Sequence, residues 1–203
     1  MKEIFYDWGG LNVALFHLIN DVHGGVLDRL MQLATALGDH GNFPLYLFLL
    51  LLSGYVAVLR QPHATAAHRH AALRWLPVLV VFSAGYVADG WLIGALKPML
   101  DFPRPPLALG EAAVHVVGKA ELHHSLPSGH ASFAMLLIAS VWPLLGRRGR
   151  QLGVAFVLWV GLSRISLGAH FPADVLGGYL LSLGVVALLY RGVRELARRL
   201  VQE

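Results

Sequence analysis

The chain has no cysteine, which excludes disulfide bonds, thiolate metal sites and cysteine nucleophiles. Charge is also scarce, since 14% of its 203 residues are charged and 56% are hydrophobic. An average soluble domain carries roughly 25% charged residues, so this balance is typical of a membrane protein. The net charge is +4, but the placement of the charges says more than their sum, and we expect no nucleic-acid partner.

A cleavable signal peptide and internal repeats are absent as well. The first ten residues, MKEIFYDWGG, mix charges with aromatic side chains and lack both an apolar core and a small-residue cleavage site. The remainder has no fixed-period repeat and no low-complexity tract. We therefore expect residues 1–203 to form a single integral-membrane domain.

Long apolar stretches are what the sequence does contain. A helix needs about 20 mostly apolar residues to cross a membrane. Five stretches meet this requirement: residues 41–59, 75–96, 128–146, 151–167 and 172–190. The N-terminal 38 residues hold two shorter apolar stretches, which form either interfacial helices or one broken sixth span, and we expect the span. The predicted fold is an all-α polytopic transmembrane bundle with six spans.

The arginines set the expected orientation of these spans. They fall into three groups: Arg60, Arg69 and Arg74; Arg147, Arg148 and Arg150; and Arg191, Arg194, Arg198 and Arg199. With five alternating spans, all three groups lie on one side, which the positive-inside rule makes cytoplasmic. Residues 97–127 and the turn 164–172 are then predicted to lie on the outer face.

Three cations lie at helix ends on that outer face: Lys97, Arg104 and Arg164. Lys and Arg often snorkel at the ends of spans, which is the simple explanation for any one of them. Three on the face that the positive-inside rule disfavours are harder to explain that way. We therefore expect them to bind an anion.

The segment HFPAD places His170 four residues before Asp174. Pro172 suits the first turn of a helix, where the helix dipole also favours the Asp174 carboxylate. A carboxylate that holds one imidazole nitrogen raises the basicity of the other, as a base or nucleophile requires. The alternative stays open at this point: Asp174 only stabilises a helix start, and His170 is merely interfacial.

The segment LPSGHASF opens the span that follows residue 127. Ser128 can cap this helix, whose N-terminal N–H groups favour anions, and Gly129 allows close approach of the backbone. A helix cap alone leaves His130 unexplained, whereas a histidine beside an anion site could protonate a leaving oxygen. Together with the three cations, these features meet the electrostatic demands of phosphoryl transfer without a metal. The residues alone do not tell which histidine attacks.

These segments resemble the three-part signature of the type 2 phosphatidic acid phosphatases, which vanadium haloperoxidases share. The three parts are K-x6-R-P from Lys97 to Pro105, P-S-G-H from Pro127 to His130, and S-R-x5-H-x3-D from Ser163 to Asp174. With its spans, the signature region covers about residues 75–191. The first 74 residues carry no matching signature.

The resemblance implies a role for each residue. His170 would be the nucleophile that forms a phosphohistidine, Asp174 would orient it, and His130 would protonate the leaving lipid oxygen. The residues expected to bind the phosphate are Lys97, Arg104, Ser128, Gly129 and Arg164. Members of this family are typically metal-independent six-helix membrane enzymes, so we expect no metal and no cofactor.

Other polar residues have weaker interpretations. Asp101, inside the first motif, is expected to point away from the phosphate or to pair with an arginine. Asp89 lies within a span and is expected to make a structural hydrogen bond near Lys97. Intramembrane carboxylates are costly and often functional, but we assign Asp89 no catalytic role.

The outer loop, residues 106–126, contains His115, His123 and His124. A histidine cluster can bind zinc or copper, but a lid or headgroup contact is the favoured interpretation. Residues 115–124 are expected to form a short interfacial helix, with Lys119 near a headgroup or second phosphate.

The leading functional hypothesis is a lipid phosphatase at the outer face of a bacterial cytoplasmic membrane, with membrane lipids and a lipid phosphate as partners. Hydrolysis of undecaprenyl pyrophosphate to the monophosphate is favoured, with phosphatidylglycerophosphate and phosphatidic acid as rivals. Transfer of the phosphohistidine to another lipid is a second enzymatic hypothesis. A non-enzymatic anion or lipid transporter is the third, and it predicts that His170 is dispensable.

Overall fold

The computed structural model describes residues 6–61 and 65–202, and within this part of the chain every regular element is a helix. The predicted all-α fold is therefore confirmed. The α-helices are α2 (Leu11–Asn20), α3 (Gly25–Leu37), α4 (Phe43–Leu59), α5 (Thr65–Leu100), α6 (Pro105–Leu109), α7 (Gly129–Val141), α8 (Arg147–Ser166) and α9 (Pro172–Gln202). The short 3-10 helices are η1 (Trp8–Gly10), η2 (His40–Asn42), η3 (Glu111–Ala113) and η4 (Trp142–Leu144).

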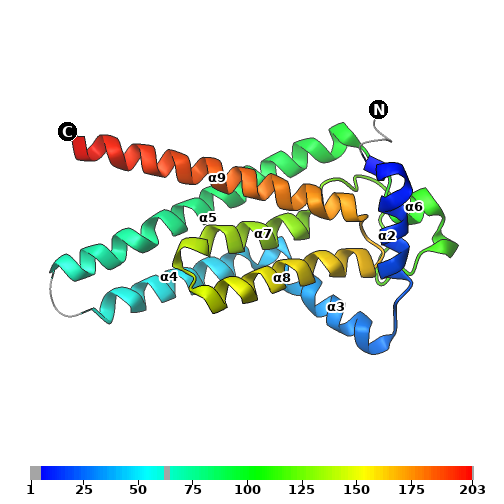
Figure 1. The fold of residues 1–203 in the computed structure, drawn as a ribbon, viewed down its shortest axis with the longest axis horizontal. Coiled ribbons are helices and arrows are strands. Elements are labelled where there is room, and N and C mark those ends of the chain that lie inside the picture. Colours follow the sequence, from blue (N-terminus) through cyan, green and yellow to red (C-terminus); the bar gives the residue numbers. More distant parts are fainter. Residues whose placement is uncertain (1–5, 62–64, 203) are drawn as a thin grey trace.

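The long helices run side by side along the long axis of the molecule, and α7 lies at the centre of the bundle (Figure 1). α7 packs against α5, α8 and α9, while α4 packs on α5 and α3 packs on α8. One cluster of buried side chains includes Phe16, Val157 and Phe171, and a second includes Phe82, Phe133 and Leu136. The two clusters hold α7 between its neighbours, so the start of α7 has a fixed position at one end of the bundle.

Each of the five predicted spans coincides with a helix, but two helices extend past the predicted ends. α5 begins ten residues before residue 75, and α9 continues twelve residues beyond residue 190. Both extensions are rich in Ala, Leu and Arg, which favour helix even where the surroundings are polar. Among the described residues, three helical segments can cross a membrane by length and composition: His40–Leu59, Ala66–Leu109 and Pro172–Arg199. The number of six spans stays a prediction.

Within residues 1–38, the structure describes two short helices, as either of the two alternatives requires. From residue 6 on, this region contains α2 of 10 residues and α3 of 13 residues, separated by the polar turn before Gly24 and Gly25. α2 lies across the end of the bundle, whereas α3 runs obliquely against α8 (Figure 1). Neither helix alone is about 20 residues long, the length needed to cross a membrane. Interfacial helices and a broken sixth span therefore both stay predictions.

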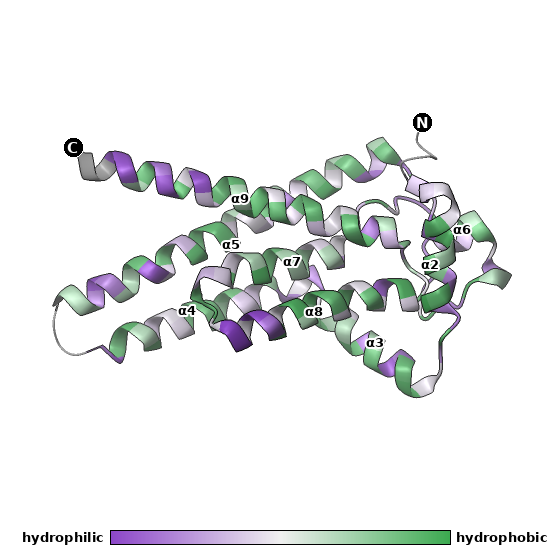
Figure 2. Cartoon of the chain, in the orientation of Figure 1, coloured by the Kyte–Doolittle hydropathy of each residue, from purple (hydrophilic) through white to green (hydrophobic). Residues whose placement is uncertain are grey.

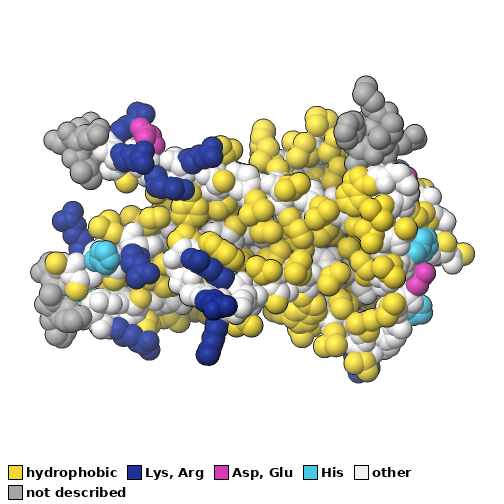
Figure 3. Space-filling model, viewed as in Figure 1, with side chains coloured by type: hydrophobic (Ala, Val, Ile, Leu, Met, Phe, Trp, Pro, Cys, Tyr) yellow, Lys and Arg dark blue, Asp and Glu magenta, His cyan; other side chains and the backbone are white. Residues whose placement is uncertain are grey.

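The surface of the bundle separates into an apolar belt and a basic end. Large exposed hydrophobic side chains line α4, α5, α8 and α9, including Phe48, Tyr55, Trp91 and Leu180. Hydrophilic residues gather at the start of α5, the start of α8 and the C-terminal part of α9 (Figure 2). Lys and Arg side chains crowd the half of the molecule away from α2 and α6 (Figure 3). An exposed apolar belt of this kind is suited to lipid rather than water.

Candidate active site

The predicted site residues all lie at the end of the bundle marked by α2 and α6, each beside a helix terminus. Lys97 is in the last turn of α5, Arg104 precedes α6, Ser128 precedes α7, Gly129 and His130 begin α7, Arg164 is in the last turn of α8, His170 precedes α9, and Asp174 is in its first turn. These eight residues come from the three separate segments of the signature, and five helices bring them to the same end of the bundle.

The two signature histidines are brought to the same end by a direct link between their segments. The Ser128 N–H donates a hydrogen bond to the Asp174 carbonyl oxygen over 2.9 Å. The arrangement in which the histidines lie on opposite surfaces is thereby excluded.

His170 and Asp174 form a buried pair. His170 Nδ1 lies 3.4 Å from Asp174 Oδ2, and the two side chains are 2% and 0% exposed. The same carboxylate oxygen accepts hydrogen bonds from Ser125 Oγ at 2.5 Å and from the Phe171 N–H at 2.8 Å. The other oxygen accepts a bond of 2.7 Å from the Tyr6 hydroxyl. A carboxylate oxygen beside Nδ1 accepts the proton of that nitrogen, so it favours the tautomer of His170 that carries its proton on Nδ1.

Arg104 contacts the opposite nitrogen of the nucleophile candidate. Its Nη1 lies 3.4 Å from His170 Nε2 and donates to the Ala169 carbonyl at 3.3 Å. Its Nε donates to the His123 carbonyl at 3.0 Å, and its Nη2 pairs with Glu121 Oε2 at 2.5 Å. Because a guanidinium has donors only, His170 Nε2 must face it with a lone pair. This lone pair is the one a nucleophile needs.

Burial sets the protonation state of His170. Removal from water lowers the pKa of the His170 imidazole to about 4, because the charged form is poorly solvated there. Asp174 opposes this shift, and the Arg104 and Arg164 guanidinium groups reinforce it. Burial, together with the charge of Asp174, raises the pKa of Tyr6, so this hydroxyl stays protonated and able to donate. His170 is accordingly a neutral imidazole at neutral pH.

Two buried polar atoms in the site have no hydrogen-bond partner among the described residues. They are Arg164 Nε and Ser128 Oγ. A different atom of the Arg164 guanidinium, Nη1, donates a hydrogen bond to Thr35 Oγ1 at 2.5 Å. Ser128 occupies the N-cap position of α7, but its hydroxyl makes no cap bond, contrary to the expectation that it caps the helix. Unpaired buried donors beside Lys97 and Arg104 are costly unless an anion accepts from them.

His130 has its own carboxylate partner, from a segment without a signature. Its Nε2 lies 3.3 Å from Asp39 Oδ2, with the side chains 25% and 54% exposed. Asp39 Oδ1 accepts from the Gly41 N–H at 2.7 Å, which fixes the carboxylate before α4. The His40 ring packs beside the His130 ring. A Cβ atom at Gly129 would come within 2.9 Å of the His40 ring. Glycine is therefore required here by close approach of a side chain, as well as by any bound phosphate.

Sequence reasoning missed the site residues contributed by the first 74 residues and the outer loop. These are Tyr6, Thr35, Asp39, Ser125 and Glu121. Most of them act across more than 90 residues of chain, so no local spacing marks them. The one available signal was the polar segment GDHGN between two apolar stretches, which contains Asp39.

The outer loop lacks the short helix expected in it. Residues 115–124 form no helix, because Asn20 fixes the backbone of His115 through bonds of 2.8 and 2.9 Å in an extended path. Asp101 pairs with His124 at 3.1 Å and with His123 at 3.7 Å rather than with an arginine. Lys119 lines a small cavity together with Arg104, Glu121 and Arg164. Among the described residues, no group of three or more His, Asp or Glu side chains is arranged to hold a metal ion.

Asp89 has the structural role expected of it, although its partners differ. Its carboxylate accepts hydrogen bonds from Ser132 at 2.8 Å and Ser182 at 2.9 Å, and both serines are fully buried. The three residues tie α5, α7 and α9 together inside the bundle. These serines, rather than Lys97, satisfy the carboxylate.

Comparison with known proteins agrees with the geometry of this site. A family model described as the PAP2 superfamily matches residues 75–198, more than half of the chain. The chain is 26% identical over 152 residues to the lipid A 1-phosphatase of Rhizobium johnstonii, covering 74% of this chain and 61% of that protein. It is 34% identical over 107 residues to the undecaprenyl-diphosphatase BcrC of Bacillus subtilis, covering 50% of this chain and 51% of that protein.

The fold has a solved counterpart as well. The crystal structure of LpxE from Aquifex aeolicus matches with a TM-score of 0.69 and 23% identity, covering 89% of this chain and 95% of that one. The chain spans less than two thirds of the length of both curated relatives named above. With the signature residues gathered at one end of the bundle and the family model matched across them, the chain belongs to the PAP2 superfamily, in its membrane-spanning branch.

Proposed function

We propose that this protein hydrolyses a lipid phosphate or lipid diphosphate through a phosphohistidine on His170. The observation that carries the proposal is the state of this imidazole, which is neutral, fixed by Asp174 at Nδ1 and directed by Nε2 toward Arg104. An imidazole held in this way is a ready nucleophile for phosphorus. The unpaired donors at Ser128 and Arg164 supply the binding site for the phosphoryl oxygens.

The first step exchanges one bond to phosphorus for another. His170 Nε2 attacks, a P–N bond forms, and the P–O bond to the lipid breaks on the opposite side. His130 gives its proton to the departing oxygen. Lys97, Arg104 and Arg164 neutralise the charge that accumulates on the non-bridging oxygens. The products of this step are a free lipid alcohol, or a lipid monophosphate from a diphosphate substrate, and phosphohistidine.

The second step returns the enzyme to its starting state. Water attacks the phosphohistidine, and neutral His130 accepts a proton from it. The P–N bond breaks, inorganic phosphate leaves and His130 is protonated again. Transfer to a lipid hydroxyl in place of water would follow the same route, so the acceptor alone separates hydrolase from transferase.

Undecaprenyl pyrophosphate is the favoured substrate. The match to an undecaprenyl-diphosphatase supports it, while the match to a lipid A 1-phosphatase supports a lipid phosphate of another kind. With the arginine-rich end cytoplasmic, the site faces the outside of a bacterial cytoplasmic membrane, where such a lipid carrier is recycled. A panel of undecaprenyl pyrophosphate, phosphatidylglycerophosphate, phosphatidic acid and a lipid A phosphate, compared by kcat/KM, tests this choice.

Trapping the intermediate tests the mechanism. Purified protein given a 32P-labelled lipid phosphate and quenched in alkali is expected to retain label on His170, and His170→Ala is expected to retain none. His70→Ala, at the far end of α5, is the matched control and is expected to label normally. Free labelled phosphate indicates a hydrolase, and a labelled second lipid indicates a transferase. Phosphate release by His170→Ala at the wild-type rate would contradict the assignment of His170 as the nucleophile, and no phosphate release by the wild-type protein from any lipid would favour a transporter.

A chelator experiment tests the expectation of metal independence. The three cationic side chains perform the charge neutralisation that a metal ion would otherwise supply. Excess EDTA is therefore expected to leave the rate unchanged, and a loss that added Mg²⁺ restores would contradict this part of the proposal.

A further inference from the structure

A groove lies between α7, α8 and α9, away from the site. Its volume is about 410 Å³, and its walls are almost entirely apolar, with Met135, Ile138, Val154, Leu158 and Leu183 among them. α8 and α9 approach each other near the site and diverge toward the opposite end, while α7 packs against both (Figure 1). The lining on α7 runs from Met135 to Trp142, which is roughly 7 to 18 Å below His130 at 1.5 Å per residue.

Tyr179 closes the groove toward the active site. This residue of α9 crosses to α8, where its hydroxyl donates to the Val157 carbonyl at 2.6 Å. Gly161 makes the crossing possible, since a Cβ atom there would collide with the tyrosine hydroxyl. Tyr179 is therefore a fixed side chain at the end of the groove nearer the active site.

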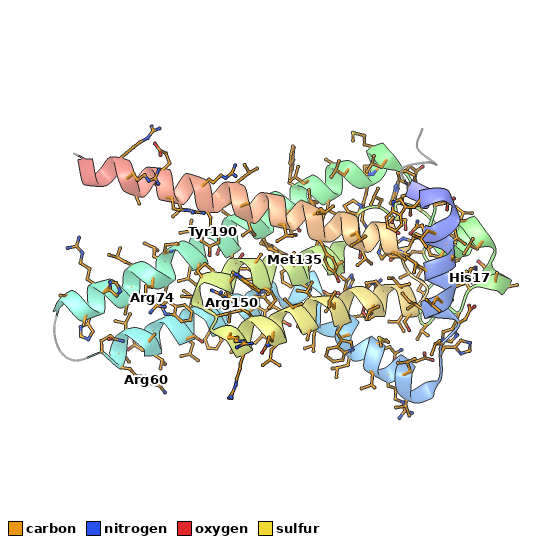
Figure 4. All side chains as sticks on the ribbon, in the orientation of Figure 1. His17, Arg60, Arg74, Met135, Arg150 and Tyr190 are labelled. Carbon is orange, nitrogen blue, oxygen red and sulfur yellow. The ribbon has the colours of Figure 1, made fainter. Side chains whose placement is uncertain are left out.

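The other end of the groove opens at the basic half of the molecule. A second hollow of about 410 Å³ shares Trp142, Val154 and Leu158 with the groove and is bordered by Arg150. The Arg150 guanidinium lies 5.2 Å from the centre of the Trp142 ring. Figure 4 shows Met135 and Arg150 on neighbouring helices of this region. The mouth thus combines a cation with an aromatic ring of the kind found at membrane interfaces.

The three arginines that begin α8, of which Arg150 borders the second hollow, have no charged partner in the described part of the chain. No carboxylate there lies within ion-pair distance of Arg147, Arg148 or Arg150. All three occupy the first turn of α8, where the helix dipole repels positive charge. This arrangement is unfavourable by itself and becomes favourable when an anion binds. An apolar groove that ends at unpaired cations complements a molecule with an apolar chain and an anionic head.

We propose that this groove binds an anionic phospholipid from the leaflet on the arginine side, separate from the substrate. One acyl chain lies between α8 and α9 against α7, and the lipid phosphate lies at Arg150 beside Trp142. Anionic lipids of the cytoplasmic leaflet supply this chemistry, and the sign of the mouth selects them over zwitterionic lipids. The bound lipid fills the space where α8 and α9 diverge.

Native mass spectrometry of the detergent-purified full chain tests the proposal. Titration with dioleoyl-phosphatidylglycerol is expected to show one bound lipid per chain. Dioleoyl-phosphatidylcholine is expected to bind with lower affinity. Arg150→Gln is expected to weaken phosphatidylglycerol binding about fivefold, the effect of one cation near a lipid phosphate. Ala187→Phe, which fills the groove, is expected to abolish it. Arg198→Gln on α9 is the control for charge alone and is expected to bind as wild type.

Each contrary result would overturn the proposal. Equal affinity for the two lipids, or an unchanged phosphatidylglycerol affinity in Arg150→Gln, removes the anion site. A dimer that Ala187→Phe dissociates assigns the groove to a second copy of the chain. A rise in KM for the lipid phosphate when phosphatidylglycerol is added assigns it to the substrate tail. Because Arg150→Gln is a surface change, it keeps the test valid even if Ala187→Phe unfolds.

Discussion

The site contains two imidazole–carboxylate pairs that differ in almost every physical respect. His170 and Asp174 are four residues apart, nearly completely buried, and surrounded by additional donors. His130 and Asp39 are 91 residues apart, partly exposed, and joined by one contact of 3.3 Å. The first pair is built to hold one tautomer in place, whereas the second retains contact with water.

This difference matches the two tasks of a phosphoryl-transfer reaction. A nucleophile must present the same lone pair in every cycle, so its imidazole gains from burial and a fixed partner. A general acid must lose a proton in one step and recover one in the next, so exposure to water is useful. The assignment of His170 to attack and His130 to proton transfer, which the resemblance alone supplied, thereby receives a physical argument.

The largest effect is expected from breaking the buried pair. Asp174→Asn keeps the shape of the side chain but removes the charge that holds the proton on His170 Nδ1. We expect kcat/KM to fall about 10³- to 10⁴-fold, as when a comparable buried aspartate is lost from another His-dependent site. The measurement is steady-state hydrolysis of the lipid phosphate, with folding checked by thermal unfolding. A loss of less than tenfold would show that the carboxylate does not set the tautomer.

The pH dependence is expected to report the buried pair as well. His170 must be neutral to attack, and its pKa is lowered to about 4. The rate should therefore stay high as the pH falls from 7 to 5 and decline only near pH 4, where the imidazole takes up a proton. A phosphate monoester has its own ionisation near pH 6, two units higher, so the two limbs can be separated. If the rate instead declined near pH 6.5 and the ionisation of the substrate did not explain this decline, His170 would be exposed to water.

A smaller effect is expected from breaking the exposed pair. We expect Asp39→Asn to slow hydrolysis of a lipid phosphate about tenfold, because His130 is then less well placed and less able to keep its proton. A water-soluble aryl phosphate has a leaving group, the aryl oxide, that departs without needing a proton. The hydrolysis of this substrate should therefore change less than twofold. Asp21→Asn, in the exposed turn after α2, is the control. Equal losses with both substrates would assign Asp39 to binding or folding.

How much of this site the sequence predicts depends on where each contact comes from. The helices follow from apolar stretches that carry their own signal, and the signature residues follow from fixed local spacing. The direction of α3 depends on its packing against α8, which the local sequence of residues 25–37 does not record. The cap expected of Ser128 is not formed, since its buried hydroxyl makes no hydrogen bond to the start of α7. Contacts made across distant segments have no local pattern to read.

Tyr6 is the clearest example, and its loss is the smallest change we predict. Its hydroxyl donates to Asp174 Oδ1 at 2.7 Å, while its ring stacks on Phe102 with a centroid distance of 4.1 Å. Tyr6→Phe keeps the stacking and removes only the hydrogen bond. The carboxylate retains its other donors, so we expect kcat to fall about threefold to tenfold with KM unchanged, which is the size of one ordinary hydrogen bond. Tyr55→Phe, on the exposed face of α4, serves as the control. A rise in KM with unchanged kcat would place Tyr6 in substrate binding and leave Ser125, the Phe171 N–H and His170 as the groups that fix the carboxylate.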